Sequence, residues 1–127
     1  MIIHLDTSVV IDTFSGPFRS RLALRSVIVA EHRIAVSTLV LYEWLRGPRL
    51  ETEMADQEAA LPATAAVEFD HACARTAARL YGLVKRARGR EIDIAIAACA
   101  IEHGAALWTL NEGDFHDIPG LILYRTS

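Results

Sequence analysis

The chain has 127 residues, which is the length of one domain with a core of its own and short for two. Hydrophobic residues make up 52% of it and charged residues 23%, a balance typical of a globular protein rather than a disordered one. A formal net charge of -3 argues against coating nucleic acid by bulk positive charge, although it leaves local basic patches open.

The first part of the chain predicts a buried strand and two helices. Residues 1–5, MIIHL, form a short apolar run that ends at Asp6 without a basic flank, so no signal peptide is expected. Helical patterns follow at 7–14 and 18–32, with a Gly-Pro pair between them. No window reaches the roughly 18 uncharged apolar residues that a membrane span needs, so we expect no membrane segment.

The middle of the chain continues this alternation. A strand is predicted at 33–37, a helix at 38–46 and a charge-dense, solvated helix at 51–62. Residues 63–69 predict a third strand, and residues 70–88 a long helix with one apolar stripe. The members of that stripe are Cys73, Ala77, Leu80, Tyr81 and Val84.

The last part predicts a helix at 91–103, ended by Gly104, and strands at 105–109 and 121–124. Strands that alternate with helices are usually parallel and joined by crossovers. We therefore expect a single α/β domain over residues 1–127. It should be a three-layer sandwich in which helices flank a central, mainly parallel sheet of four to five strands.

The cysteines and histidines do not suggest a zinc site. Cys73 and Cys99 lie in apolar helical segments and form no metal-spaced set, which favours reduced core residues in a cytoplasmic protein. The five His residues show no zinc spacing either.

Acidic residues follow two of the predicted strands, where parallel sheets usually bind their ligands. Asp6 comes directly after the first strand, although Asp is also a good helix N-cap, and capping is the simpler explanation for Asp6 alone. Asn111 and Asp114 follow the strand at 105–109 in the stretch TLNEGDF, where ordinary turn chemistry also explains them.

Two further carboxylates stand in apolar helices. Glu43 lies in LVLYEWL, where burying an unpaired carboxylate would be costly. Two ordinary explanations are that position 43 is the one solvent-exposed position of an amphipathic helix, or that Glu43 forms a salt bridge with Arg46 or Arg49. Asp93, with Glu91, opens the apolar segment EIDIAIAACA. A carboxylate in the first turn is stabilised by the helix dipole, which suffices to explain Asp93 on its own.

Taken together, the four acidic positions favour a functional site, because they can meet at one edge of the sheet. Carboxylates that converge repel one another and usually enclose a cation, and oxygen ligands of this kind suit Mg²⁺ or Mn²⁺. Such an ion can polarise a phosphate and activate water, which is the chemistry of phosphodiester hydrolysis. No Gly-rich phosphate loop is present, and no Ser-His-Asp order falls on strand ends.

Four stretches together resemble a PIN domain, and more narrowly the VapC toxins of bacterial toxin–antitoxin pairs. They are HLDTSVVID, the helix that carries Glu43, DIAIAACAIEHGAALWTLNEGDF, and IPGLILY. The resemblance covers nearly the whole chain. The C-terminal block is quite specific, with Asp, Ile-Ala-Ala, Gly and T-x-N-x-x-D-F in order, whereas the first motif alone would be weak.

The resemblance implies an endoribonuclease that depends on Mg²⁺ or Mn²⁺, acts as a toxin, is inhibited by a cognate VapB-like antitoxin and forms a homodimer. The family's acidic quartet carries over to Asp6, Glu43, Asp93 and Asp114. Asp6, Asp93 and Asp114 are then expected to hold the metal. Glu43 is expected to complete the site and to orient or deprotonate the attacking water.

Several neighbouring residues can support this site. Asn111 stands where some relatives have Asp and others Asn, and it can offer a neutral oxygen. Thr7, Ser8 and Thr109 are near enough in sequence to hydrogen-bond a ligand or phosphate, although ordinary capping explains them as well.

Basic residues lead towards Asp93 and are candidates for the RNA backbone. Arg75, Arg79 and Arg86 are expected on one helical face, and Arg88 and Arg90 follow in the stretch KRARGR. Phosphate contacts of this kind make binding depend on salt. A solvated helix face explains any one of these arginines equally well.

Three other readings are open. A receiver-like signalling module also has acids at strand ends, but it has adjacent acids after the first strand and a Lys where Leu110 stands. A haloacid-dehalogenase-type phosphatase has a second Asp where Ser8 stands. A PIN fold that has lost activity and serves only for binding is the third, and the intact quartet makes it the poorer choice.

Overall fold

Three parallel strands form the central sheet of the protein. The structure, a computed structural model, describes residues 1–126. Strand β1 (Ile2–Leu5) lies between β2 (Arg33–Ala35) and β3 (Ala106–Trp108), so the strand order is β2-β1-β3. Both pairings are parallel, with Ile3 opposite Ile34 on one side and opposite Ala106 on the other. The central strand is thus the first in the sequence.

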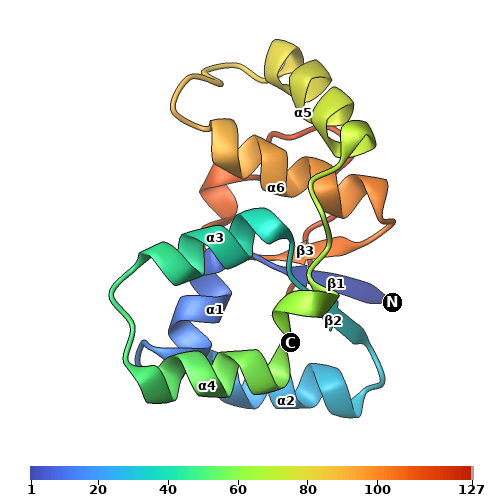
Figure 1. Cartoon of the computed structure of the whole chain (residues 1–127). Coiled ribbons are helices and arrows are strands. Elements are labelled where there is room, and N and C mark those ends of the chain that lie inside the picture. The colour runs from blue at the N-terminus through green and yellow to red at the C-terminus, as the bar shows by residue number, and fades with distance from the viewer. Residues whose placement is uncertain (127) are drawn as a thin grey trace.

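Helices cover both faces of this sheet, and Figure 1 shows α5 and α6 on one side of the strands and α2 and α4 on the other. The helices are α1 (Thr7–Phe14), α2 (Ser20–Val29), α3 (Thr38–Arg46), α4 (Glu51–Ala60), α5 (His71–Leu83) and α6 (Glu91–Glu102), with short 3₁₀ turns η1 (Ala63–Ala65) and η2 (Glu112–Asp114). The expected α/β sandwich with a parallel sheet is confirmed.

The sheet has fewer strands than the four to five expected. The segments at 63–69 and 121–124 do reach its two edges, but each forms only one isolated bridge, Ser37 with Val67 and Leu107 with Leu123. Two backbone hydrogen bonds hold each segment, for example Val67 N to Val36 O at 2.8 Å. The η1 turn takes up the first half of 63–69, so too few extended residues remain to build a ladder.

The helix expected at 70–88 is shorter than predicted. Helix α5 ends at Leu83, and Arg86 has a φ of 58°, a left-handed conformation that no α-helix contains. The predicted stripe is also partly wrong, because Tyr81 is exposed and the buried face consists of Cys73, Thr76 and Leu80. Similarly, the helix expected at 18–32 is confined to Ser20–Val29.

Helix α6 is the buried element around which the core is built. Its residues Ile94 and Ile96 to Ala100 are all buried, as expected of a helix that is apolar on every side. The small Ala side chains let it pack closely between the sheet and α5.

Cys73 and Cys99 are buried and free, and burial raises the pKa of both thiols, which confirms that they are core residues.

None of the helices described between residues 1 and 126 is long and apolar enough to cross a membrane.

Packing of α5 on α6 predicts a contrast between two leucines of the same helix. Leu80 is fully buried, and its replacement by Ala should lower the free energy of unfolding by about 2–5 kcal/mol because it leaves a cavity. Leu83 is 59% exposed, and Leu83→Ala should change it by less than about 0.5 kcal/mol. Urea unfolding of both variants measures the difference, and equal losses would contradict this packing.

Candidate functional site

The four predicted acidic residues come from four different elements and meet at the carboxyl end of the sheet. Asp6 directly follows β1, Glu43 lies in α3, Asp93 lies in the first turn of α6, and Asp114 ends η2. Their proximity is evident at Asp93, whose pKa rises from an ordinary 3.8 to about 6. Burial is the largest cause, and the negative charges of Asp6, Asp114 and Glu43 follow.

Asp6 is buried and is not acting as a helix cap. It occupies the N-cap position of α1, but its side chain makes no hydrogen bond to the backbone of that helix. Instead its Oδ2 accepts hydrogen bonds from Ser8 Oγ at 2.9 Å and from Thr109 Oγ1 at 2.8 Å. Its backbone N–H donates to Trp108 O at 2.9 Å. Both the backbone and the side chain of Asp6 are therefore fixed to the end of β3.

The hydroxyls of Ser8 and Thr109 join the two strand ends. Ser8 Oγ accepts from Leu110 N, and Thr109 Oγ1 accepts from Asn111 N, both at 3.0 Å. Each hydroxyl thus accepts a hydrogen bond from a backbone N–H and donates one to the carboxylate of Asp6. Both side chains act by positioning Asp6, and Asn111 enters this network through its backbone.

Glu43 is tied to the start of α1. Thr7 Oγ1 donates a hydrogen bond to Glu43 Oε1, and Arg46 Nη2 lies 3.4 Å from Oε2. Since the Arg46 side chain is 54% exposed, this ion pair is weak. The expected alternative partner, Arg49, instead donates to Trp44 O at 3.0 Å. The contact of Thr7 with Glu43 is visible only in three dimensions, because 36 residues separate them.

The donor set suits a hard divalent cation. Carboxylate oxygens are the ligands that Mg²⁺ and Mn²⁺ prefer, and the mutual repulsion felt by Asp93 is relieved by a positive ion. Between residues 1 and 126, no three His, Cys, Asp or Glu side chains form a ready-made metal cage. Mg²⁺ fits such an open arrangement, since it usually binds one or two carboxylates and keeps several waters.

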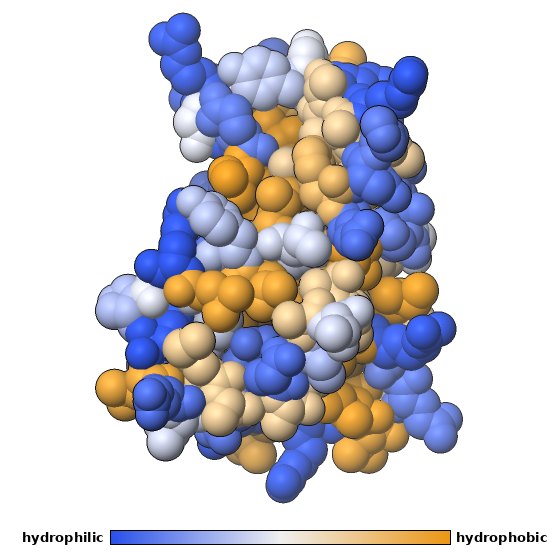
Figure 2. Space-filling view, viewed as in Figure 1, coloured by the Kyte–Doolittle hydropathy of each residue, from blue (hydrophilic) through white to orange (hydrophobic). Residues whose placement is uncertain are grey.

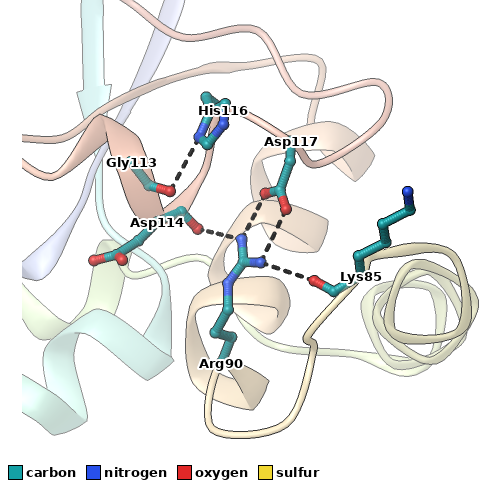
Figure 3. A network of polar contacts seen from close by, with 6 residues as sticks. All are labelled: Lys85, Arg90, Gly113, Asp114, His116 and Asp117. Atoms are coloured by element: carbon teal, nitrogen blue, oxygen red, sulfur yellow. Dashed lines mark hydrogen bonds and ion pairs between the residues drawn. The ribbon is translucent and has the colours of Figure 1, made fainter.

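The five arginines predicted to contact the RNA backbone differ in their surroundings, and Arg90 is the one whose charge acts on Asp93 and Asp114. Arg75 and Arg79 are exposed on α5, and Arg86 and Arg88 are exposed in the connection that leads to α6. Arg86 lies beyond the end of α5, so it does not share a helical face with the first two, contrary to the prediction. Arg90 differs from the others because its guanidinium binds the protein itself (Figure 3).

The comparisons with known proteins agree with the fold. The sequence profile of the PIN domain matches residues 3–121. A chain of the DNA-bound VapBC2 complex from Rickettsia felis superposes with a TM-score of 0.75 at 21% identity, over 100% of both chains. For DNA-bound VapBC from Salmonella typhimurium the TM-score is 0.74 at 24% identity, covering 98% of this chain and 97% of the other.

A toxin–antitoxin complex from Klebsiella pneumoniae gives a TM-score of 0.71 at 23% identity and covers 98% of this chain and 99% of its own. The comparison with curated protein sequences gave no match. The protein is an α/β domain with an acidic cluster at its strand ends. It belongs to the PIN domain family.

The pKa of Asp93 can be tested directly. In metal-free protein its carboxyl group should titrate near pH 6, and Glu43→Gln or Asp114→Asn should lower the midpoint by removing a negative neighbour. Because the folded-state pKa is raised, this group stabilises the fold below about pH 3.8 and loses that contribution as the pH rises through about 6.

Titration of the Asp93 side-chain carbon by NMR measures the midpoint, and added Mg²⁺ should lower it because the ion binds the ionised form. Glu91→Gln is the matched control, since Glu91 is exposed on the same turn. A midpoint near 3.8 in metal-free protein would contradict the crowding of charges.

Proposed function

We propose that the protein is a metal-dependent endoribonuclease that acts as the toxin of a toxin–antitoxin pair. The observation that carries this proposal is the meeting of four carboxylates at one end of the sheet, where burial and the charges of the other three raise the pKa of Asp93. Crowding of this kind lowers the stability of the fold at neutral pH, and perturbed groups in such clusters are typical of catalytic sites. PIN family membership and the VapBC structures point to the same chemistry.

Each acidic residue has a distinct part in the proposed reaction. Asp6, Asp93 and Asp114 would hold Mg²⁺ or Mn²⁺, directly or through water. The ion supplies polarisation of the phosphate and a lowered pKa of water. Glu43, oriented by the hydroxyl of Thr7, would accept the proton of the attacking water. Attack in line with the leaving oxygen would give a 5′-phosphate and a 3′-hydroxyl.

The same network explains why Asp6 stays ready for an ion. Its Oδ2 accepts hydrogen bonds from the hydroxyls of Ser8 and Thr109, which fix the orientation of the carboxylate. Its other oxygen, Oδ1, is then the one that would face the ion. Asn111, exposed at the start of η2, would add a neutral oxygen ligand.

RNA would reach the acidic site over its basic rim. The phosphates are repelled by the carboxylates, so the positive charge must come from the margin of the site. Arg75 and Arg79 on α5, with Arg86 and Arg88 ahead of α6, are exposed and suited to this role.

The exposed apolar surface suits protein partners, a cognate VapB-like antitoxin and a second copy of the chain. Figure 2 shows apolar atoms gathered at the centre of one face, around α3 and α6, with charged residues along its margins. On α3, Tyr42 is 54% and Leu45 47% exposed, and on α2 Leu22 is 76% and Val29 75% exposed. Apolar patches of this kind commonly mark interfaces.

A PIN fold that serves only for binding is the alternative from another class. It has no use for carboxylates whose repulsion lowers stability, and the hydroxyls of Ser8 and Thr109 that orient Asp6 would likewise be unnecessary. The decisive difference is turnover, which a binding module lacks.

Cleavage of a structured RNA pool by purified, antitoxin-free protein tests the proposed reaction. With Mg²⁺ or Mn²⁺, products should accumulate, and chelator should abolish them. Asp93→Asn should reduce the rate by at least about 100-fold because it removes a charged ligand of the ion. Glu91→Gln, a change of the same chemistry at an exposed position two residues away, should retain wild-type activity.

Equal cleavage by wild type and Asp93→Asn would contradict the assignment of the site. Absence of products from folded wild-type protein over a wide set of RNAs, with metal present, would favour the binding-only alternative.

The basic rim predicts a change in salt dependence. The double variant Arg75→Gln/Arg79→Gln should weaken RNA binding at low salt, and the slope of log Kd against log salt should fall by about 1 to 2 because two phosphate contacts are lost. Arg25→Gln, an exposed arginine on α2, is the control and should leave the slope unchanged. Filter binding to catalytically inactive Asp93→Asn carrying these changes measures the slopes without cleavage.

A further inference from the structure

Arg90 connects the two segments that carry Asp93 and Asp114. It is the N-cap residue of α6, and its carbonyl oxygen accepts a hydrogen bond from Ile94 N at 2.9 Å. Its backbone is therefore part of the turn that presents Asp93. Its side chain extends from this turn to the loop that follows η2, as Figure 3 shows.

The guanidinium binds that loop through two kinds of acceptor. Nη1 and Nη2 donate to the two carboxylate oxygens of Asp117, at 3.0 and 2.6 Å, which is the strong bidentate geometry. Nη2 also donates to the backbone oxygen of Asp114 at 2.8 Å, and Nη1 to Lys85 O at 3.4 Å. One side chain thus joins the start of α6, the connection before it and the loop after η2.

This arrangement leaves the carboxylate of Asp114 available. Arg90 holds Asp114 by its backbone carbonyl, and Figure 3 shows the Asp114 carboxylate pointing away from the guanidinium. Asp117 is the residue whose charge Arg90 neutralises, and the hydrogen bonds from Arg90 lower the pKa of Asp117. The acidic site therefore keeps its charge although an arginine lies next to it.

The pair is better shielded than an ordinary surface ion pair. The side chain of Arg90 is 19% exposed and that of Asp117 34% exposed. Partial burial and a two-point contact make such a pair stronger and more rigid than the exposed pairs elsewhere, such as Arg21 with Asp56 at 3.8 Å. An arginine held in this way is poorly placed to contact RNA phosphates.

We propose that Arg90 is a positioning residue of the acidic site. With Asp117 it forms a clamp that fixes the loop carrying Asp114 against the turn carrying Asp93, and so sets the spacing of the two carboxylates for a divalent ion. Its consequence for catalysis rests on the proposed nuclease function, whereas its effect on ion binding and loop order does not.

Three roles for Arg90 make different predictions. If it acted only through its charge, Arg90→Gln would remove a repelling cation and tighten Mn²⁺ binding. If it contacted RNA, Arg90→Gln would raise KM and reduce the salt slope, with Mn²⁺ binding and kcat unchanged. As a clamp, its loss should weaken Mn²⁺ binding and lower kcat, because residues that orient metal ligands commonly contribute about 10- to 100-fold.

The experiment measures Mn²⁺ binding by electron paramagnetic resonance in purified protein free of RNA and antitoxin. Arg90→Gln, Arg90→Lys and Asp117→Asn should each bind Mn²⁺ about 10-fold more weakly. Arg90→Lys is the most informative change, since it keeps the charge and removes only the bidentate geometry. The double variant Arg90→Gln/Asp117→Asn should be no weaker than either single one.

Arg25→Gln is the control, because Arg25 is an exposed arginine on α2, and it should bind Mn²⁺ like wild type. Amide hydrogen exchange at residues 112–118, measured without metal, should speed up in the clamp variants and not in the control. Circular dichroism at the assay temperature establishes that each variant is folded. If Arg90→Gln does not fold, Asp117→Asn tests the same clamp from its loop side.

Wild-type or tighter Mn²⁺ binding by folded Arg90→Lys and Asp117→Asn would overturn the proposal. A nuclease assay that gives no products from wild type would count against the proposed function alone, because ion binding and amide exchange still decide whether the clamp exists.

Discussion

Repulsion among four carboxylates at one end of a small sheet is the constraint that the rest of the structure serves. Left alone, the carboxylates of Asp6, Glu43, Asp93 and Asp114 would move apart, and burial together with this repulsion raises the pKa of Asp93 to about 6. Each acid is therefore held by something rigid. Asp6 is bound by two hydroxyls, Glu43 by Thr7, Asp93 by a helix buried in the core, and Asp114 by a loop pinned at its backbone.

The rigid parts were the easiest to predict from sequence. Alternating strands and helices led to the parallel sheet, and the positions of Asp6 and Asp93, just after a strand and at the start of a helix, placed them at one edge. The two edge segments were harder to predict. The residues around Val67 and Leu123 are extended, but each segment pairs with the sheet through a single bridge, and a sequence pattern does not show how many residues will pair. Similarly, the apolar pattern of α5 continues to Val84 although the helix stops at Leu83.

The polar contacts between distant segments could not be predicted in this way. Arg90 reads as one more basic residue in KRARGR, and only the position of Asp117, 27 residues later, distinguishes it from Arg88. Thr7 and Thr109 read as ordinary capping residues, yet both bind carboxylates. Such pairings depend on which distant segments the fold brings together, and a single sequence does not show this. The acidic residue that follows a strand can be recognised from its neighbours in the sequence alone.

The central position of β1 also affects when the protein can begin to function. Residues 2–5 are synthesised long before β3, at residues 106–108, which is one of their two partner strands. Asp6 has its backbone bound to Trp108 and its side chain to Thr109, so it cannot reach its final position until these two residues have been synthesised. Contacts this far apart in sequence form late during folding. A nascent chain would then carry no assembled acidic cluster until β3 has been made and has paired with β1.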